Sequence, residues 1–171
     1  MICFHLLFWL AWVPAAHGQF LVLPNSLTAA EGGFNNVVPF GITQSLGASA
    51  RYQQVYAASQ FSDFSKDLFL ITQISFRPDS FRGAAFSSVL PDVQINLSTT
   101  TASTENLNAA YSVNVGLDDT IVFPRGALAI SSMLVGPKSG PKDFDIVIDL
   151  ATPFFYQPTA VTKSLEKTVE S

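Results

Sequence analysis

The chain has 171 residues, of which 48% are hydrophobic and 13% are charged, and its formal net charge at pH 7 is −4. This length suffices for one domain with a hydrophobic core, and the composition argues against intrinsic disorder. The acidic balance argues against a nucleic-acid partner, because phosphate binding needs a basic patch.

Residues 1–18 have the pattern of a secretory signal peptide. An apolar run over residues 2–13 ends at Pro14, and small residues precede the cleavage site that we expect after Gly18. The run is shorter than the about 20 residues that cross a bilayer, so we expect no transmembrane segment after cleavage. No Lys or Arg precedes the run, and an uncleaved, membrane-anchored leader is therefore the alternative.

The leader also contains the only cysteine, both histidines and both tryptophans of the chain. Its removal would take away the thiol and imidazole groups on which nucleophilic triads and most zinc sites depend. The remaining domain, residues 19–160, would have no disulfide and would depend on apolar burial for its stability. We expect this product to be secreted, to the extracellular space or the cell envelope.

Short strands separated by Gly- and Pro-containing turns dominate the rest of the chain. The clearest is predicted over residues 92–98, where apolar and polar residues alternate, and residues 144–150 repeat that alternation. Residues 68–76 alternate less cleanly, and residues 111–115 form another short alternating run. Weaker candidates are residues 37–42, 51–57, 120–123 and 127–131. Residues 124–126, Pro-Arg-Gly, predict a turn. The pattern predicts an all-β, single-domain, antiparallel β-sandwich of jelly-roll or Greek-key type.

Residues 161–171 lose the aromatic side chains and gain charge. Val161, Leu165 and Val169 are spaced by four, as in a short amphipathic helix. A helix of this length is marginal alone, so a disordered tail is the alternative.

Four phrases carry a resemblance to a known group: RYQQVYAASQF, ITQISFRPD, LPDVQINLSTT and GPKDFDIVIDLATPFFYQP. Together they resemble the N-terminal β region of exported bacterial proteins, mostly uncharacterised, that usually end in a PEP-CTERM sorting signal read by an exosortase. The resemblance implies an extracellular or envelope β-sandwich without known catalytic residues. After Pro158 the chain lacks the Pro-Glu-Pro, the apolar segment and the terminal Arg cluster of that pattern. We expect either a free secreted form or a truncated fragment of a surface-anchored protein.

Arg51, Tyr52 and Tyr56 are the candidate ligand-binding residues. Tyr52 and Tyr56 share a face if residues 51–57 form a strand, and a phenol ring with a polar tip suits stacking on sugars. The alternative is that the rings pack at the core or its rim. The preferred hypothesis is a non-catalytic binding or structural role, with an extracellular glycan or surface polymer as the partner.

Four aspartates are candidate calcium ligands, and we expect no other cofactor. Asp118 and Asp119 lie in a predicted turn, and Asp143 and Asp145 are two residues apart. The spacing of an EF-hand is absent, and the alternative for Asp118 is that it caps the turn.

The competing hypothesis is a small, carboxylate-dependent, glycan-active enzyme, because a glycosidase needs two carboxylates about 5–9 Å apart. Asp92, Asp143, Asp145 and Asp149 are the candidates. Asp145 and Asp149 would lie about 13 Å apart along one strand, so one of them would need a partner from another strand.

Overall fold

The computed structural model describes residues 18–32, 50–62, 68–81, 83–158 and 164–170. The strands in these residues are β1 (Arg51–Tyr56), β2 (Phe69–Phe76), β3 (Phe86–Thr100), β4 (Thr120–Ser132), β5 (Ile146–Tyr156) and β6 (Ser164–Glu170). Three short 3₁₀ helices lie between strands or before them: η1 (Asn25–Leu27), η2 (Ala58–Phe61) and η3 (Tyr111–Val113). Leader residues 1–17 and the strand predicted at 37–42 lie outside the described residues.

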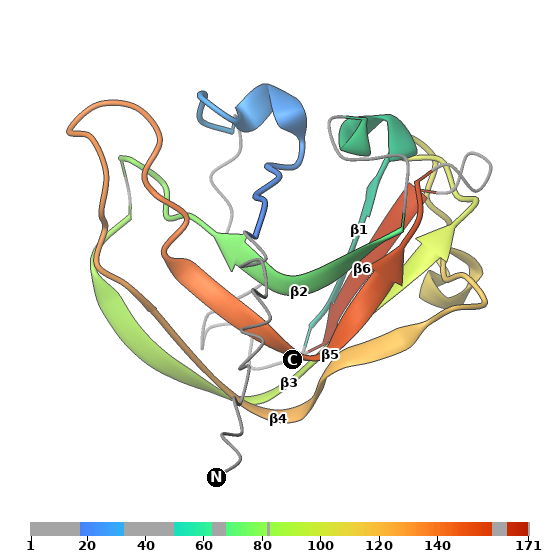
Figure 1. The fold of residues 1–171 in the computed structure, drawn as a ribbon. Helices are drawn as coiled ribbons and strands as arrows, with labels where there is room; N and C mark the ends of the chain where they lie inside the picture. The colour runs from blue at the N-terminus through green and yellow to red at the C-terminus, as the bar shows by residue number, and fades with distance from the viewer. Residues whose placement is uncertain (1–17, 33–49, 63–67, 82, 159–163, 171) are drawn as a thin grey trace, which may run out of the picture.

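The strands form two antiparallel sheets (Figure 1). One sheet has four strands in the order β1–β6–β3–β4, and the other consists of β2 and β5. β5 also contacts β4, which brings the two sheets together along one side. The predicted all-β, antiparallel fold class is confirmed.

Both sheets bury apolar side chains in one common core. Leu97 comes from the larger sheet, and Ile148 and Tyr156 come from the smaller one. The ring of Tyr156 lies 4.6 Å from the ring of Phe61 and 5.4 Å from that of Phe69, measured between centroids. Burial raises the pKa of Tyr156 to about 12, because the ionised phenolate would lose its hydration there.

Alternation located most of the strands. The predictions at residues 51–57, 68–76 and 92–98 fall on β1, β2 and β3. In β3 the side chains at 93, 95 and 97 are buried, as the alternation predicts.

The turn predicted at residues 124–126 is wrong, because β4 continues through it from Thr120 to Ser132. Pro124 has no N–H to give to a regular ladder, and the ladder between β3 and β4 shifts register around this point. A bulge therefore accommodates Pro124 where the sequence alone indicates a break.

The strand predicted at residues 111–115 is also wrong, since Tyr111–Val113 form η3. Val113 is 64% exposed, so the alternation does not reflect an inward and an outward face. Asn114 fixes the local fold instead: its Nδ2 donates to the Asn108 carbonyl at 2.9 Å, and its Oδ1 accepts from the Asn108 N–H at 2.9 Å.

The helical or disordered tail predicted at residues 161–171 is corrected to a strand, β6, over its described part. β6 lies between β1 and β3 and pairs with both. Leu165, Lys167 and Val169 share its inner side and are buried, and Thr168 on the opposite side is buried as well. The residues of the inner side follow a strand period of two. Because the middle one is a lysine, only Leu165 and Val169 count as apolar, and their spacing of four suggests a helix.

Candidate functional site

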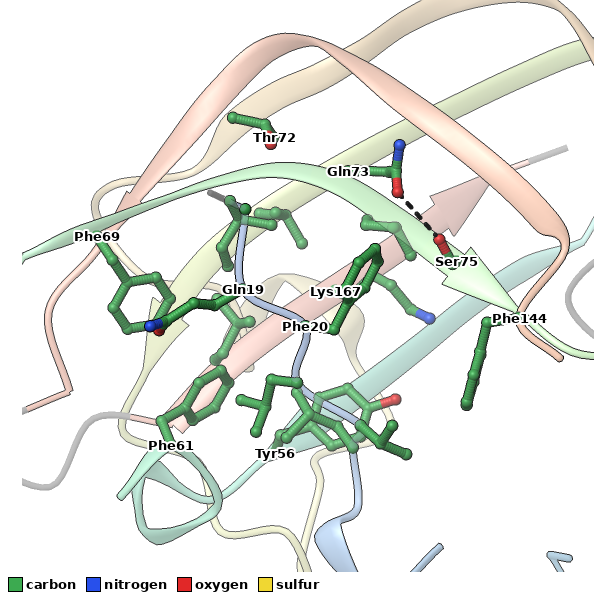
Figure 2. Close-up of a pocket in the computed structure, with 18 of the residues that line it drawn as sticks. Gln19, Phe20, Tyr56, Phe61, Phe69, Thr72, Gln73, Ser75, Phe144 and Lys167 are labelled. Atoms are coloured by element: carbon green, nitrogen blue, oxygen red, sulfur yellow. Dashed lines mark hydrogen bonds between the residues drawn. The ribbon is translucent and has the colours of Figure 1, made fainter. Parts of the chain in front are cut away.

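A cavity of about 590 Å³ lies between the two sheets (Figure 2). β2 forms one wall along its whole length, and the inner face of the larger sheet forms another with Leu97, Leu165 and Lys167. The segment 18–23 forms a third side. The cavity is thus built from parts of the chain that are remote in sequence.

The N-terminal segment is held in place by contacts on both of its sides. Leu21 and Leu23 pack against the common core. The N–H of Asn25 donates to Oε1 of Gln60 at 2.7 Å, and the Arg77 guanidinium donates to the carbonyl groups of η1 and the residues that follow it. These bonds position the segment as a wall of the cavity.

Most of the cavity lining is aromatic or aliphatic, and its one charged residue among the described residues is Lys167. Lys167 lies opposite Gln54 on β1 and Leu97 on β3, and it is only 5% exposed. Its Nζ lies 4.5 Å from the centroid of the Phe76 ring and 5.9 Å from that of Tyr52. Ring faces attract a cation, so the two rings offset part of the cost of burying this ammonium group.

The predicted tyrosine pair shares one face of β1 and points toward the core rather than toward solvent. Tyr56 lines the cavity, and the Tyr52 hydroxyl donates to Oε1 of Gln54 at 3.1 Å. Burial raises the pKa of Tyr52; burial, and next the neighbouring Tyr52, raise the pKa of Tyr56. Both phenols therefore stay protonated at neutral pH and can donate hydrogen bonds.

Arg51 lies on the opposite face of β1 from these tyrosines. Its guanidinium lies 5.0 Å from the centroid of the Tyr111 ring, and the Tyr111 hydroxyl donates to the Arg51 carbonyl at 2.8 Å. The structure thus brings Tyr52 and Tyr56 together and places Arg51 in a separate contact.

The first pair of predicted calcium ligands is engaged in hydrogen bonds with β3. Oδ1 of Asp118 accepts the Thr99 N–H of β3 at 2.8 Å, a bond across to the neighbouring strand rather than within the turn of Asp118. Both carboxylate oxygens of Asp119 accept from Nδ2 of Asn96 at 3.1 Å. These bonds tie the turn before β4 to the neighbouring strand.

The second pair lies just before β5. Oδ2 of Asp145 accepts from the Ser132 hydroxyl at 3.0 Å and from the Met133 N–H at 2.8 Å, while the Asp143 N–H donates to the Val135 carbonyl. Within the described part of the chain, Oδ1 of Asp145 is buried without a hydrogen-bond partner, and no three His, Cys, Asp or Glu residues group as a metal site. Calcium binding stays a prediction.

The remaining acids proposed for catalysis lie outside the cavity lining. Asp92 pairs with Arg125 at 2.8 Å across β3 and β4 on the surface, and Asp149 accepts from Nε2 of Gln73 at 2.8 Å. None of the described residues that line the cavity is Asp or Glu.

Sequence reasoning missed Lys167 as a site residue. Its signal was the alternation Leu165-x-Lys167-x-Val169, which on a strand directs the lysine to the same side as its two apolar neighbours. Read in this way, the pattern predicts an inward-facing cation.

Among the described residues, no helix is long and apolar enough to span a membrane. Comparison of the chain with protein-family models, with curated proteins and with solved structures found no match.

Proposed function

We propose that this chain is an exported, non-catalytic β-protein that binds a small, mainly apolar ligand between its two sheets. The observation that carries the proposal is the cavity of about 590 Å³ with its aromatic and aliphatic lining. Ligand pockets for small molecules typically have volumes of about 300–1,000 Å³, are mostly apolar and contain a few polar groups that orient the ligand.

The nature of the lining favours binding over catalysis by carboxylates. A glycosidase needs two acids on either side of the scissile bond. The polar groups that the described lining offers are instead the Lys167 amine, the Tyr56 phenol, the Gln19 amide, and amide or hydroxyl groups of β2. An apolar ligand also fits better than an extracellular glycan, because Tyr52 and Tyr56 face inward and offer no exposed stacking platform.

Export and the sandwich architecture are parts of the same proposal. The leader pattern over residues 1–18 and the resemblance to exported bacterial proteins support export. Two antiparallel sheets that share one core support a β-sandwich, with the ligand between its layers.

Binding is tested with the secreted product of a bacterial host that expresses the full chain. The apolar fluorophore N-phenylnaphthylamine should bind with increased emission. Ile74→Phe adds volume to the cavity wall and should weaken binding about tenfold, because the larger side chain occupies the space of the probe.

The matched control is Val147→Phe, an enlargement on β5 at a position that is 43% exposed and outside the cavity lining. We expect it to bind the probe as the unmodified chain does. Absence of probe binding, or equal affinity in both variants, would contradict the proposed site.

Export is tested by N-terminal sequencing of the protein in the culture medium. A chain that starts at Gln19 is the expected result. A chain that starts at Met1, or one that stays with the cells, would contradict this part of the proposal.

A further inference from the structure

The chemistry along the cavity changes from one end of β2 to the other. At the Phe69 end, Phe61 and Phe69 supply aromatic walls, with 6.1 Å between their ring centroids. At the Phe76 end, the ammonium group of Lys167 lies against the Phe76 ring. Figure 2 shows Phe61 and Phe69 together on one side of the space and the Lys167 amine directed toward the side of Phe144.

The length of this wall sets the scale of a ligand. Phe69–Phe76 has eight residues, all of which line the cavity. At about 3.3 Å per residue, the strand extends for about 23 Å between its first and last residue. An extended aliphatic chain with a head group at one end matches this shape.

We propose that the ligand is a single-chain amphiphile with an anionic head, such as a fatty-acid carboxylate, whose head binds the Lys167 ammonium. The aliphatic chain lies along β2 toward Phe61 and Phe69. This inference rests on the proposed function and names the class of ligand for the same cavity.

Charge and solvation both favour that orientation. Lys167 is almost fully buried, and an anion beside a buried ammonium interacts more strongly than it would in water. Lys167 has other interactions in the protein, but an ammonium group has three donors and can take a further acceptor. The protonated phenol of Tyr56, which lines the same cavity, is a second donor for the head group.

The test compares ligands that share one chain and differ only in the head: laurate, dodecanol and dodecylamine. Each is titrated at neutral pH against the full secreted product loaded with N-phenylnaphthylamine, and displacement is measured. We expect laurate to bind about tenfold or more tightly than dodecanol, because its head makes a charge-assisted hydrogen bond, and dodecylamine to bind most weakly.

Lys167→Met keeps the apolar stem and removes the charge, so it should bring the affinity for laurate to that for dodecanol. The control Lys138→Met removes an exposed charge on the connection between β4 and β5 and should keep the preference. If Lys167→Met does not fold, Lys167→Arg should retain a preference for laurate, since the charge is kept.

The outcomes separate this inference from the proposed function. Equal displacement by laurate and dodecanol overturns the anionic head while the apolar site stands. A laurate preference that survives Lys167→Met overturns the assignment of the head to Lys167, because the α-amino group of Gln19, which lines the cavity and becomes the N-terminus on cleavage, is then the remaining cation. Failure of the fluorophore itself to bind overturns both.

Discussion

Residues 101–119 lie against the outer face of the four-stranded sheet at β1 and the C-terminal part of β3, and we call them the outer cover, whereas the inner face of the sheet is turned toward β2 and the segment 18–23. The outer cover is closely bonded: Nδ2 of Asn114 donates to Oε1 of Gln53 at 2.7 Å, and the Gly116 N–H donates to the Ser98 hydroxyl at 3.2 Å. The inner cover leaves a cavity of about 590 Å³.

The difference separates two tasks within one sheet. On the outer side, buried polar groups are paired by specific hydrogen bonds, so a substitution there leaves a partner unpaired. Such contacts stabilise the fold. The inner side is apolar and bounds a cavity in which Lys167 is the one charged residue of the described lining, as the proposed ligand site would require. Substitutions on the outer side should therefore reduce stability, and those on the inner side should mainly change binding.

The strongest challenge to the outer cover is Gly116→Ala. A Cβ at this position would lie 1.7 Å from the Thr99 carbonyl oxygen, so the backbone of the cover must move. We expect the free energy of unfolding, measured by urea denaturation, to fall by about 3 kcal/mol. Gly126→Ala is the control, because the nearest atom to its Cβ is 3.8 Å away, and it should change stability by less than about 1 kcal/mol. Equal stability of the two variants would contradict the close fit.

A second way to break the outer cover is Asn114→Ala. Asn114 is 2% exposed, and its amide bonds both Gln53 and the backbone of Asn108. The loss of these bonds should cost about 2 kcal/mol of unfolding free energy, because buried partners are left unsatisfied. Asn106→Ala, at an exposed position of the same connection, should be close to neutral. A neutral Asn114→Ala would show that the cover is looser than its hydrogen bonds indicate.

The smallest expected effect concerns the core residue Tyr156 and the dependence of stability on pH. The folded pKa of Tyr156 is raised to about 12, above the unfolded value of about 10. Below pH 10 both states keep the proton and stability is unaffected; above it the unfolded state ionises first, so stability falls as pH rises toward 12. When the pH is raised from about 8 to about 11, the free energy of unfolding of Tyr156→Phe should fall by about 1 kcal/mol less than that of the unmodified chain, as measured by urea denaturation at each pH. Identical pH profiles would contradict the burial of this phenol.

Sequence reasoning located the strands whose alternation was apolar. β3 is predicted because its buried positions 93, 95 and 97 carry Val, Ile and Leu. β6 is missed because Lys167 occupies the middle of its buried side, and a charged residue is usually a sign of exposure. The rule that a charged residue indicates an exposed position therefore fails at Lys167, which is buried.

The candidate site was harder to predict for a different reason. The strand period places Tyr52 and Tyr56 on one face, but both faces of β1 contain polar residues, so the pattern does not say which face is inside. The cavity also needs the segment 18–23, β2 and the larger sheet together. No local signal encodes the space between parts so remote in sequence.

The position of β6 has a consequence for the order in which the molecule can form. β1 is joined to the larger sheet through β6, where Arg51 pairs with Glu170, and β6 in turn pairs with β3. Closing a connection of more than 100 residues is entropically costly, and folds built on such contacts form slowly. The wall that carries Lys167 is therefore completed only after residues 164–170 have emerged from synthesis, and until then β1 and β3 lack the strand that joins them.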